Sequence, residues 1–182
     1  MVYVFLANGF EELEAIAPLD ILKRAKLDVK TVGIDGEIVT SSLGFTVKTD
    51  IRIGDITTEH LKGIILPGGT PGTTNLDNSS RVHEIIEYCI KNNILIGAIC
   101  AAPTILGKAG LLKNKSACCY PGCENDLKCA ILSQDDVCVD DNIITSKGPG
   151  TAMQFGFALL EYLKGEDITR VVMNSMQYQV AK

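Results

Sequence analysis

An uninterrupted apolar run over residues 94–99 ends at Cys100 and is followed by Pro103. No polar residue alternates along this run, so it predicts a strand covered on both faces, as in the middle of a parallel sheet. Pro103 suits the first turn of a helix, where a missing N–H costs little. Cys100 is therefore predicted to lie at a sharp turn between a central strand and a helix, where the small neighbours Ala101 and Ala102 relieve crowding.

This turn makes Cys100 a candidate nucleophile. The same strand-to-helix geometry exposes the serine of G-x-S-x-G hydrolases. A helix N-terminus behind the sulfur favours the thiolate over the thiol, and the Ala101 N–H is expected to form half of an anion hole. The alternative is a buried cysteine at the end of a core strand, because free cysteine is often buried.

The length and charge of the chain exclude several classes of protein. The 182 residues suffice for one domain, residues 1–182, with a full core. No apolar run reaches transmembrane length, and residues 1–6 have no basic segment before them, which predicts a first strand and not a signal peptide. The net charge is −5, with acids and bases scattered. That distribution argues against nucleic acid or an anionic membrane as a partner.

The chain contains seven cysteines. The odd number predicts free thiols in a reducing compartment, the cytoplasm. Cys118, Cys119, Cys123 and Cys129 are close in sequence, which raises the question of zinc. Adjacent cysteines in a strand point to opposite faces, however, and no histidine lies nearby. We therefore expect neither a metal nor a cofactor.

Strand-like and helix-like segments alternate along the chain, which predicts an α/β fold: a doubly wound, mostly parallel sheet between helices. Residues 38–40 and 45–49 are expected to form a small β-hairpin, and residues 57–61 one helical turn. Leu13 and Ile16 are expected on the apolar face of the first helix. The other predicted strands cover residues 2–6, 28–33, 63–66, 94–99, 116–120, 130–132, 137–139 and 143–146, and the helices residues 10–25, 80–92, 103–109, 152–164 and 167–173.

Three polar or glycine-rich segments follow predicted parallel strands. They are residues 8–14 after the first strand, Gly68-Gly69 after the middle one, and Cys100 after the next. Ligands of doubly wound sheets bind at the carboxyl ends of the strands. These three segments are therefore predicted to converge on one site.

The chain resembles the ThiJ/PfpI superfamily, which includes the parkinsonism-linked protein deglycase and bacterial relatives that lack the active-site histidine. The resemblance spans nearly the whole chain and implies a flavodoxin-like three-layer sandwich and a homodimer. The motifs that carry it, in family order, are GFEELE at residues 9–14, LPGG at 66–69, AICAAP at 98–103 with GLL at 110–112, and TSKGPGT at 145–151.

The resemblance also implies roles for individual residues. Cys100 matches the reactive cysteine, and Glu14 matches the carboxyl group that contacts its sulfur. Gly69 and Ala101 match the residues whose N–H groups form the anion hole. The implied activities are glyoxalase without glutathione, deglycation of early methylglyoxal adducts, peptidase and chaperone action, and the fold alone does not choose among them.

One departure from the family is the absence of a histidine after the cysteine. The only histidines are His60 and His83, which precede Cys100, and Tyr120-Pro121-Gly122 occupies the corresponding loop. A cysteine peptidase or amidotransferase-type hydrolase needs such a base, so both are disfavoured.

The sequence thus predicts a cysteine-dependent glyoxalase or deglycase. Its substrate would be a small aldehyde or a glycated adduct, attacked by a Cys100 thiolate that shares one proton with Glu14. The alternative is a redox-sensing stress protein or chaperone, in which Cys100 is oxidised to sulfenic or sulfinic acid. Cys118, Cys119 or Cys123 would then be the resolving thiol.

Overall fold

The computed structural model describes residues 1–179. Its central sheet consists of β1 (Val2–Leu6), β2 (Val29–Gly33), β5 (Ile51–Arg52), β6 (Gly63–Leu66), β7 (Leu95–Ile99), β10 (Val137–Asp140) and β11 (Ile143–Ser146). The strand order is β10-β11-β7-β6-β1-β2-β5. Every neighbouring pair is parallel except β10 and β11.

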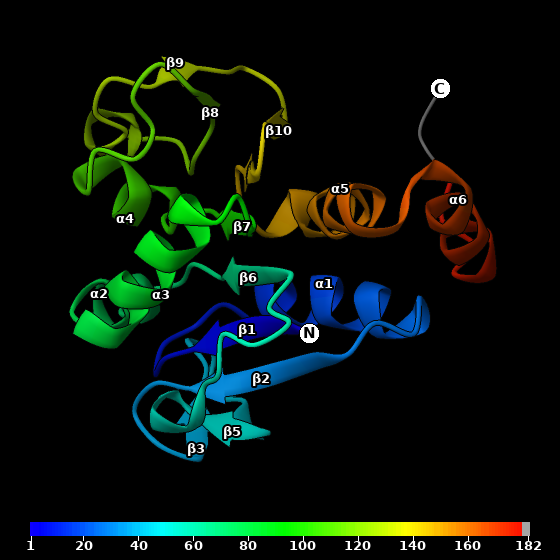
Figure 1. Ribbon diagram of the computed structural model, residues 1–182, viewed down its shortest axis with the longest axis horizontal. Helices are drawn as coiled ribbons and strands as arrows, with labels where there is room; N and C mark the ends of the chain where they lie inside the picture. Colours follow the sequence, from blue (N-terminus) through cyan, green and yellow to red (C-terminus); the bar gives the residue numbers. More distant parts are fainter. Residues whose placement is uncertain (180–182) are drawn as a thin grey trace.

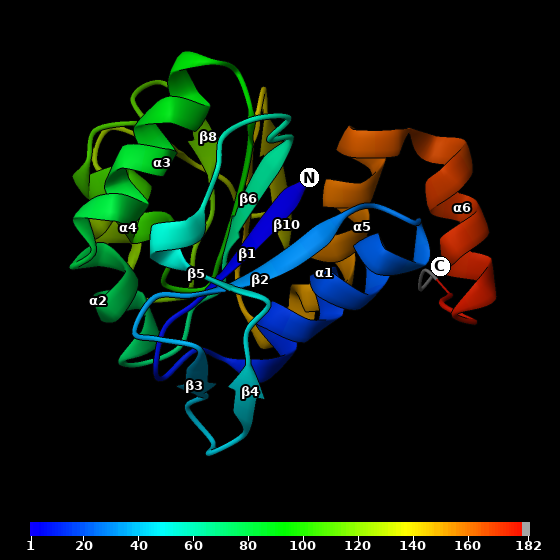
Figure 2. The same ribbon diagram turned by 60° about the horizontal axis from the view of Figure 1, so that its bottom comes forward.

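Helices cover both faces of this sheet (Figures 1 and 2). One layer contains α2 (Gly72–Asp77), α3 (Ser80–Lys91) and α4 (Pro103–Lys108). The other contains α1 (Glu12–Arg24) and α5 (Ala152–Lys164), and α6 (Glu166–Ser175) packs on α5. The predicted flavodoxin-like sandwich is therefore confirmed.

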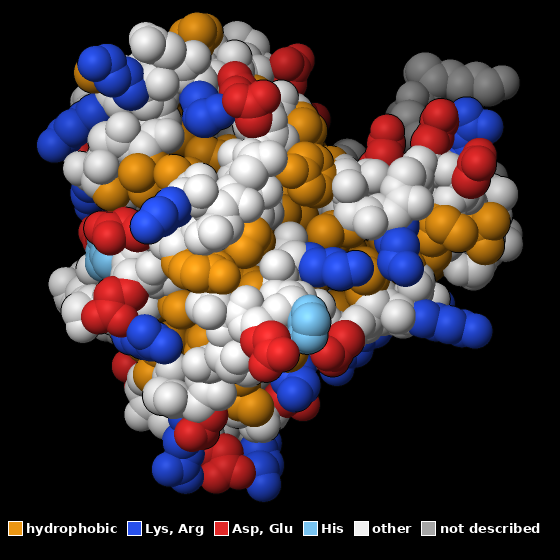
Figure 3. Space-filling model, in the orientation of Figure 1, with side chains coloured by type: hydrophobic (Ala, Val, Ile, Leu, Met, Phe, Trp, Pro, Cys, Tyr) orange, Lys and Arg blue, Asp and Glu red, His pale blue; other side chains and the backbone are white. Residues whose placement is uncertain are grey.

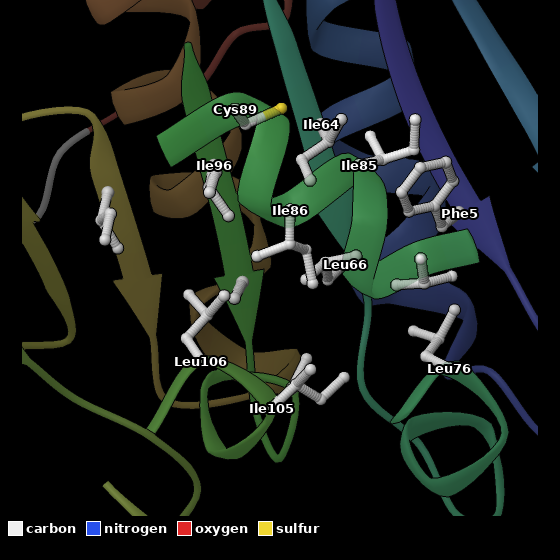
Figure 4. Close-up of a cluster of buried hydrophobic side chains, with 14 of the residues drawn as sticks. Phe5, Ile64, Leu66, Leu76, Ile85, Ile86, Cys89, Ile96, Ile105 and Leu106 are labelled. Carbon is white, nitrogen blue, oxygen red and sulfur yellow. The ribbon is translucent and has the colours of Figure 1, made fainter. Parts of the chain in front are cut away.

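The alternation of side chains along each strand creates two hydrophobic cores. In β1, Tyr3 and Phe5 face the first core, under α2, α3 and α4, whereas Val2 and Val4 face the second core, under α1 and α5. Figure 4 shows how α3 packs its apolar stripe onto the sheet in the first core. Ser79 caps this helix by accepting a hydrogen bond from the Val82 N–H at 3.4 Å.

The first helix is rotated from the predicted orientation. Its buried positions are Glu14, Ala15, Pro18, Ile21 and Leu22. Leu13 and Ile16, expected in the core, are 57% and 41% exposed. Because Glu14, Ala15 and Pro18 take the buried side of the helix, Leu13 and Ile16 turn outward, and the prediction for these two residues was wrong.

Shorter elements differ from the sequence prediction to various extents. The hairpin of β3 (Ile38–Thr40) and β4 (Thr46–Lys48) is antiparallel, as predicted. The single turn expected at 57–61 is a hydrogen-bonded turn and not an assigned helix, with the Leu61 N–H donating to the Thr58 carbonyl at 3.3 Å. A separate 3-10 turn, η1 (Ile53–Asp55), precedes it, and the Tyr3 hydroxyl donates to the Thr57 carbonyl at 3.0 Å. The strand expected at 116–120 shortens to β8 (Ser116–Ala117), which pairs with β9 (Ile131–Leu132) in a separate sheet. Two further 3-10 turns are η2 (Glu124–Asp126) and η3 (Pro149–Thr151).

The surface carries charges of both signs. Figure 3 shows acidic and basic side chains interspersed over one face. Within residues 1–179, no helix combines the length and the apolar character that crossing a membrane requires.

Candidate active site

The site lies where the strand order reverses. The chain runs outward from β1 to β2, then returns to place β6 on the other side of β1. The loops after β1 and β6 therefore meet at the crevice where such sheets bind ligands. They are joined by hydrogen bonds from the Glu11 N–H to the Gly68 carbonyl at 3.0 Å and from the Gly72 N–H to the Gly9 carbonyl at 3.2 Å.

Cys100 occupies the predicted turn between β7 and α4, with Pro103 at the start of the helix. Its φ of +65° places a non-glycine residue in the left-handed region. Two backbone hydrogen bonds hold it there: its N–H donates to the Ser146 carbonyl at 2.9 Å, and its carbonyl accepts from the Tyr120 N–H at 2.7 Å. The strained turn is thus fixed by β11 on one side and by the loop after β8 on the other.

We expect the free energy of unfolding of Cys100→Gly to exceed that of Cys100→Ala by about 1 kcal/mol. Both variants remove the sulfur, but only glycine adopts a positive φ without a steric cost. Urea titration of the two variants measures the difference. Equal stabilities would show that the turn stores no backbone strain.

Glu14 is the carboxyl group of the site and is fully buried. It lies in the first turn of α1, where the Glu11 carboxylate accepts a hydrogen bond from the Glu14 N–H at 2.8 Å. Glu14 Oε2 accepts a hydrogen bond from the Gly68 N–H at 2.8 Å. Glu14 Oε1 is also buried and has no hydrogen-bond partner among residues 1–179.

Burial gives Glu14 an unusual proton affinity. Desolvation raises the pKa of Glu14 to about 7, against the opposing effects of hydrogen bonds from the Cys100 thiol and the Gly68 N–H. The charge of Glu11 raises this pKa further. A carboxyl group with this pKa both accepts and releases protons at neutral pH, which is the property that a general base needs.

Cys100 differs from the sequence-based expectation. Burial, and after it the neighbouring Glu14 charge, raise the pKa of the Cys100 thiol to about 12. The N–H groups of Ala101 and Gly69 act in the opposite direction. A thiolate at rest was therefore the wrong expectation: the helix N-terminus is present, but desolvation outweighs it. Above pH 7 the proton lies on the Cys100 sulfur and the charge on Glu14, the reverse of the predicted arrangement.

Two glycines let the loop after β6 approach the sulfur. A Cβ on Gly68 would lie 2.7 Å from both Cys100 Cβ and Glu14 Oε2, so any side chain here would separate the pair. Gly69 has a φ of +99°, and a Cβ there would lie 2.3 Å from the Gly9 carbonyl oxygen. These two positions bring backbone N–H groups to Glu14 and to Cys100.

The predicted resolving thiols lie in other environments. Cys119 and Cys123 pack against the first core, whereas Cys100 packs against the second. Cys118 Sγ lies 3.7 Å from Thr145 Oγ1. No described contact joins these three thiols to the Cys100 sulfur, and their resolving role stays a prediction. All seven cysteines are unpaired.

Neither histidine is placed to serve as a base for Cys100. His60 is linked to the chain start through a hydrogen bond from the Met1 amino group to its carbonyl at 3.1 Å, at the edge where β1 begins. His83 lies on α3 and bonds the Asp77 carbonyl at 2.7 Å. Cys100 lies at the edge opposite His60, where the strands end.

Sequence reasoning missed two contributors to the site. The Gly68 N–H bonds Glu14, although the glycine motif was assigned only to the anion hole through Gly69. Tyr120 bonds the Cys100 carbonyl, and its ring lies beside Gly148. The only sequence signal for Tyr120 was its position in the loop that lacks a histidine.

The fold and the site together define a flavodoxin-like α/β protein with a cysteine on a strained nucleophile turn. The model of the DJ-1/PfpI family matches residues 1–162. The chain therefore belongs to the DJ-1/PfpI family, which confirms the resemblance seen in its motifs.

Relatives agree with this assignment over nearly the whole chain. Protein dj-1beta of Drosophila melanogaster is 35% identical over 176 residues, 95% of this chain and 94% of its own. A Caenorhabditis elegans relative named glutathione-independent glyoxalase DJR-1.2 is 34% identical over 167 residues, 91% of this chain and 89% of its own. The structure of oxidised Toxoplasma gondii DJ-1 superposes with a TM-score of 0.94 at 32% identity, covering 98% of both chains.

Proposed function

We propose that this protein is a glutathione-independent glyoxalase that converts methylglyoxal to lactate and also acts on early methylglyoxal adducts. The observation that carries the proposal is the pair of half-buried Cys100 and buried Glu14 beside the N–H groups of Gly69 and Ala101. A nucleophile, a base and an oxyanion site are thus present together. The name of the Caenorhabditis elegans relative agrees with this reading.

The first step is addition of sulfur to the aldehyde carbon. As the S–C bond forms, the thiol proton passes to the Glu14 carboxylate and the C=O π electrons move to the aldehyde oxygen. The N–H groups of Gly69 and Ala101 stabilise that oxyanion. A thiol with a pKa of about 12 needs this base, because almost none of it is ionised at neutral pH.

The second step moves a proton between neighbouring carbons. Glu14 gives its proton to the oxyanion, which forms a hemithioacetal and leaves Glu14 as a carboxylate again. The carboxylate then removes the proton from the former aldehyde carbon and returns it to the former ketone carbon, while the hydroxyl proton passes from the former aldehyde oxygen to the former ketone oxygen. The product is a lactoyl thioester on Cys100, formed without an external oxidant or reductant. Water then cleaves the thioester, releasing lactate and the thiol.

The direct test is lactate formation by the purified protein supplied with methylglyoxal and no glutathione. We expect lactate in proportion to methylglyoxal consumed, measured by chiral chromatography. Loss of methylglyoxal without lactate would show adduct formation only and would reject the proposed reaction.

A second candidate function is redox sensing through Cys100. The relative from Toxoplasma gondii was solved in an oxidised form, and the half-buried Cys100 sulfur faces N–H groups that would also bind a sulfinate. Mass spectrometry after mild peroxide treatment tests this function. Two added oxygens on Cys100 alone would support it, and equal oxidation of all seven thiols would count against it.

We also propose that two copies of the chain associate through α1. Leu13 and Ile16 lie 57% and 41% exposed on this helix, and a second copy would cover this apolar side. We expect a dimer in sedimentation equilibrium and a monomer for the Leu13→Glu/Ile16→Glu double variant. Ile131→Glu, at a 60% exposed position on β9, is the control that keeps the dimer. A dimer that survives the double variant would reject this interface.

A further inference from the structure

Tyr120 reaches the site from the loop between β8 and β9. Its N–H donates to the Cys100 carbonyl at 2.7 Å, so the loop is fixed to the nucleophile turn. The side chain is 49% exposed. About half of the Tyr120 residue is therefore covered by protein while its backbone is bonded to the Cys100 turn.

The Tyr120 ring and the Glu14 carboxyl group both lie close to Gly148. A Cβ built on Gly148 would lie 3.3 Å from Tyr120 Cδ2, 3.7 Å from Tyr120 Cε2 and 4.0 Å from Glu14 Oε1. One edge of the ring and the free carboxyl oxygen therefore flank the same spot. Gly148 leaves that spot without a side chain of its own.

Glu14 Oε1 is the carboxyl oxygen that must be shielded from water. Glu14 Oε2 is satisfied by the Gly68 N–H, but Oε1 is buried without a partner among residues 1–179. A buried carboxyl oxygen without a hydrogen bond stays dry only when neighbouring groups exclude water from it. The groups that act on the Glu14 carboxyl are the Cys100 thiol from the turn after β7, the Gly68 N–H and the Glu11 carboxylate beside the start of its own helix, and the Tyr120 ring lies at the same glycine, Gly148, as Oε1.

We propose that the Tyr120 ring is the cover that keeps water away from Glu14 Oε1, which makes Tyr120 a positioning residue for the base of the site. The ring does this by its area and not by its hydroxyl group. In this chain the loop after β8 thus places an aromatic ring at the position where part of the family has a histidine that could act as a second base. The inference rests on the Cys100–Glu14 pair, the same pair on which the proposed function depends, but it does not require lactate chemistry.

Removing the ring tests the cover. Difference infrared spectroscopy of the full chain follows the protonated carboxyl band through a pH titration, and Glu14→Gln assigns that band to Glu14. In Tyr120→Ala, water reaches Oε1, and we expect the midpoint to fall by about 1 pH unit, a tenfold loss of proton affinity. Tyr120→Phe keeps the ring and is expected to match the parent protein.

Two outcomes would overturn the inference. The first is an unchanged midpoint in Tyr120→Ala, and the second is an equal fall in Tyr120→Phe, which would assign the effect to the hydroxyl group. Tyr162→Ala on α5, at another partly exposed tyrosine, controls for the general loss of an aromatic side chain.

A second measurement remains available if Tyr120→Ala is too unstable to titrate. The alkylation rate of Cys100 by iodoacetamide, read by mass spectrometry against pH, is compared between Tyr120→Leu and the parent protein. We expect the rise in rate to begin at lower pH in the variant, and coincident profiles would reject the cover. Neither measurement uses methylglyoxal, so a shifted midpoint without lactate formation would reject the proposed function while this inference stands.

Discussion

Replacing Cys100 with serine is expected to lower kcat/KM for lactate formation by at least about three orders of magnitude. A serine hydroxyl is a far weaker acid than a thiol, and a carboxylate with a pKa of about 7 cannot take its proton. Cys100→Ala removes the nucleophile altogether and is expected to show no lactate above the uncatalysed rate. Steady-state kinetics with methylglyoxal, with lactate quantified by chromatography, measures both effects.

The matched control is Cys129→Ser, because Cys129 is exposed and also has a positive φ, +62°. It makes the same chemical change at the same kind of backbone position, and we expect it to keep full activity. Thermal unfolding of each variant separates loss of chemistry from loss of fold. Lactate formation by Cys100→Ala at the parent rate would exclude Cys100 as the nucleophile.

Elements with strong local signals were predictable from the sequence. The helix at residues 152–164 matches α5, which follows Gly148-Pro149-Gly150 and ends before Gly165. The strand before Cys100 and the helix start at Pro103 also match, because an unbroken apolar run and a proline leave few other arrangements. Each of these segments carries its own start or stop signal.

Elements that depend on distant contacts were not predictable. The 3-10 turn η1 before the turn at residues 58–61 was not predicted, and α2 after the glycine-rich loop had no apolar periodicity to reveal it. The rotation of α1 followed from Glu14, an acid that turns inward because the Gly68 N–H and the Cys100 thiol lie there. Periodicity alone places an acid outside and a leucine inside.

The residues that meet at the site were predictable from the sequence, but the pKa shift of Cys100 was not. Cys100, Glu14, Gly69 and Ala101 follow strand ends that a parallel sheet brings together, and the structure places them in one group. The direction in which the Cys100 pKa shifts depends on how much water reaches the sulfur, and no local sequence pattern encodes that. The structure places Cys100 on the predicted turn with the N–H groups of Gly69 and Ala101 beside it, whereas burial shifts its pKa in the direction opposite to the predicted one. Its role as nucleophile stays a prediction.

Glu14→Gln provides the second large effect, on activity and on stability together. The amide keeps the size of the side chain but cannot accept the thiol proton, so kcat/KM is expected to fall by roughly 10²–10⁴-fold. In the parent protein, activity is expected to rise with pH around pH 7, where the Glu14 carboxyl group, with a pKa of about 7, ionises. That limb of the pH profile should be absent from the variant, and its persistence would assign the titration to another group.

The same raised pKa costs stability as pH increases. Glu14 in the folded state binds its proton up to about pH 7, against an ordinary value of 4.5, so its contribution to the free energy of unfolding is fully present below the unfolded pKa. That contribution is lost as pH rises from about 4.5 through about 7, and the total loss is about 3 kcal/mol.

Glu14→Gln has no carboxyl group to ionise, so its stability relative to the parent protein should increase by about 3 kcal/mol between about pH 4 and about pH 8. Urea titrations at both pH values measure this difference. Glu87→Gln, on the exposed side of α3, removes a carboxyl group far from the site and is the control. A stability difference between Glu14→Gln and the parent that does not vary with pH would show that Glu14 is hydrated in the folded protein, and it could not then serve as the base that Cys100 needs.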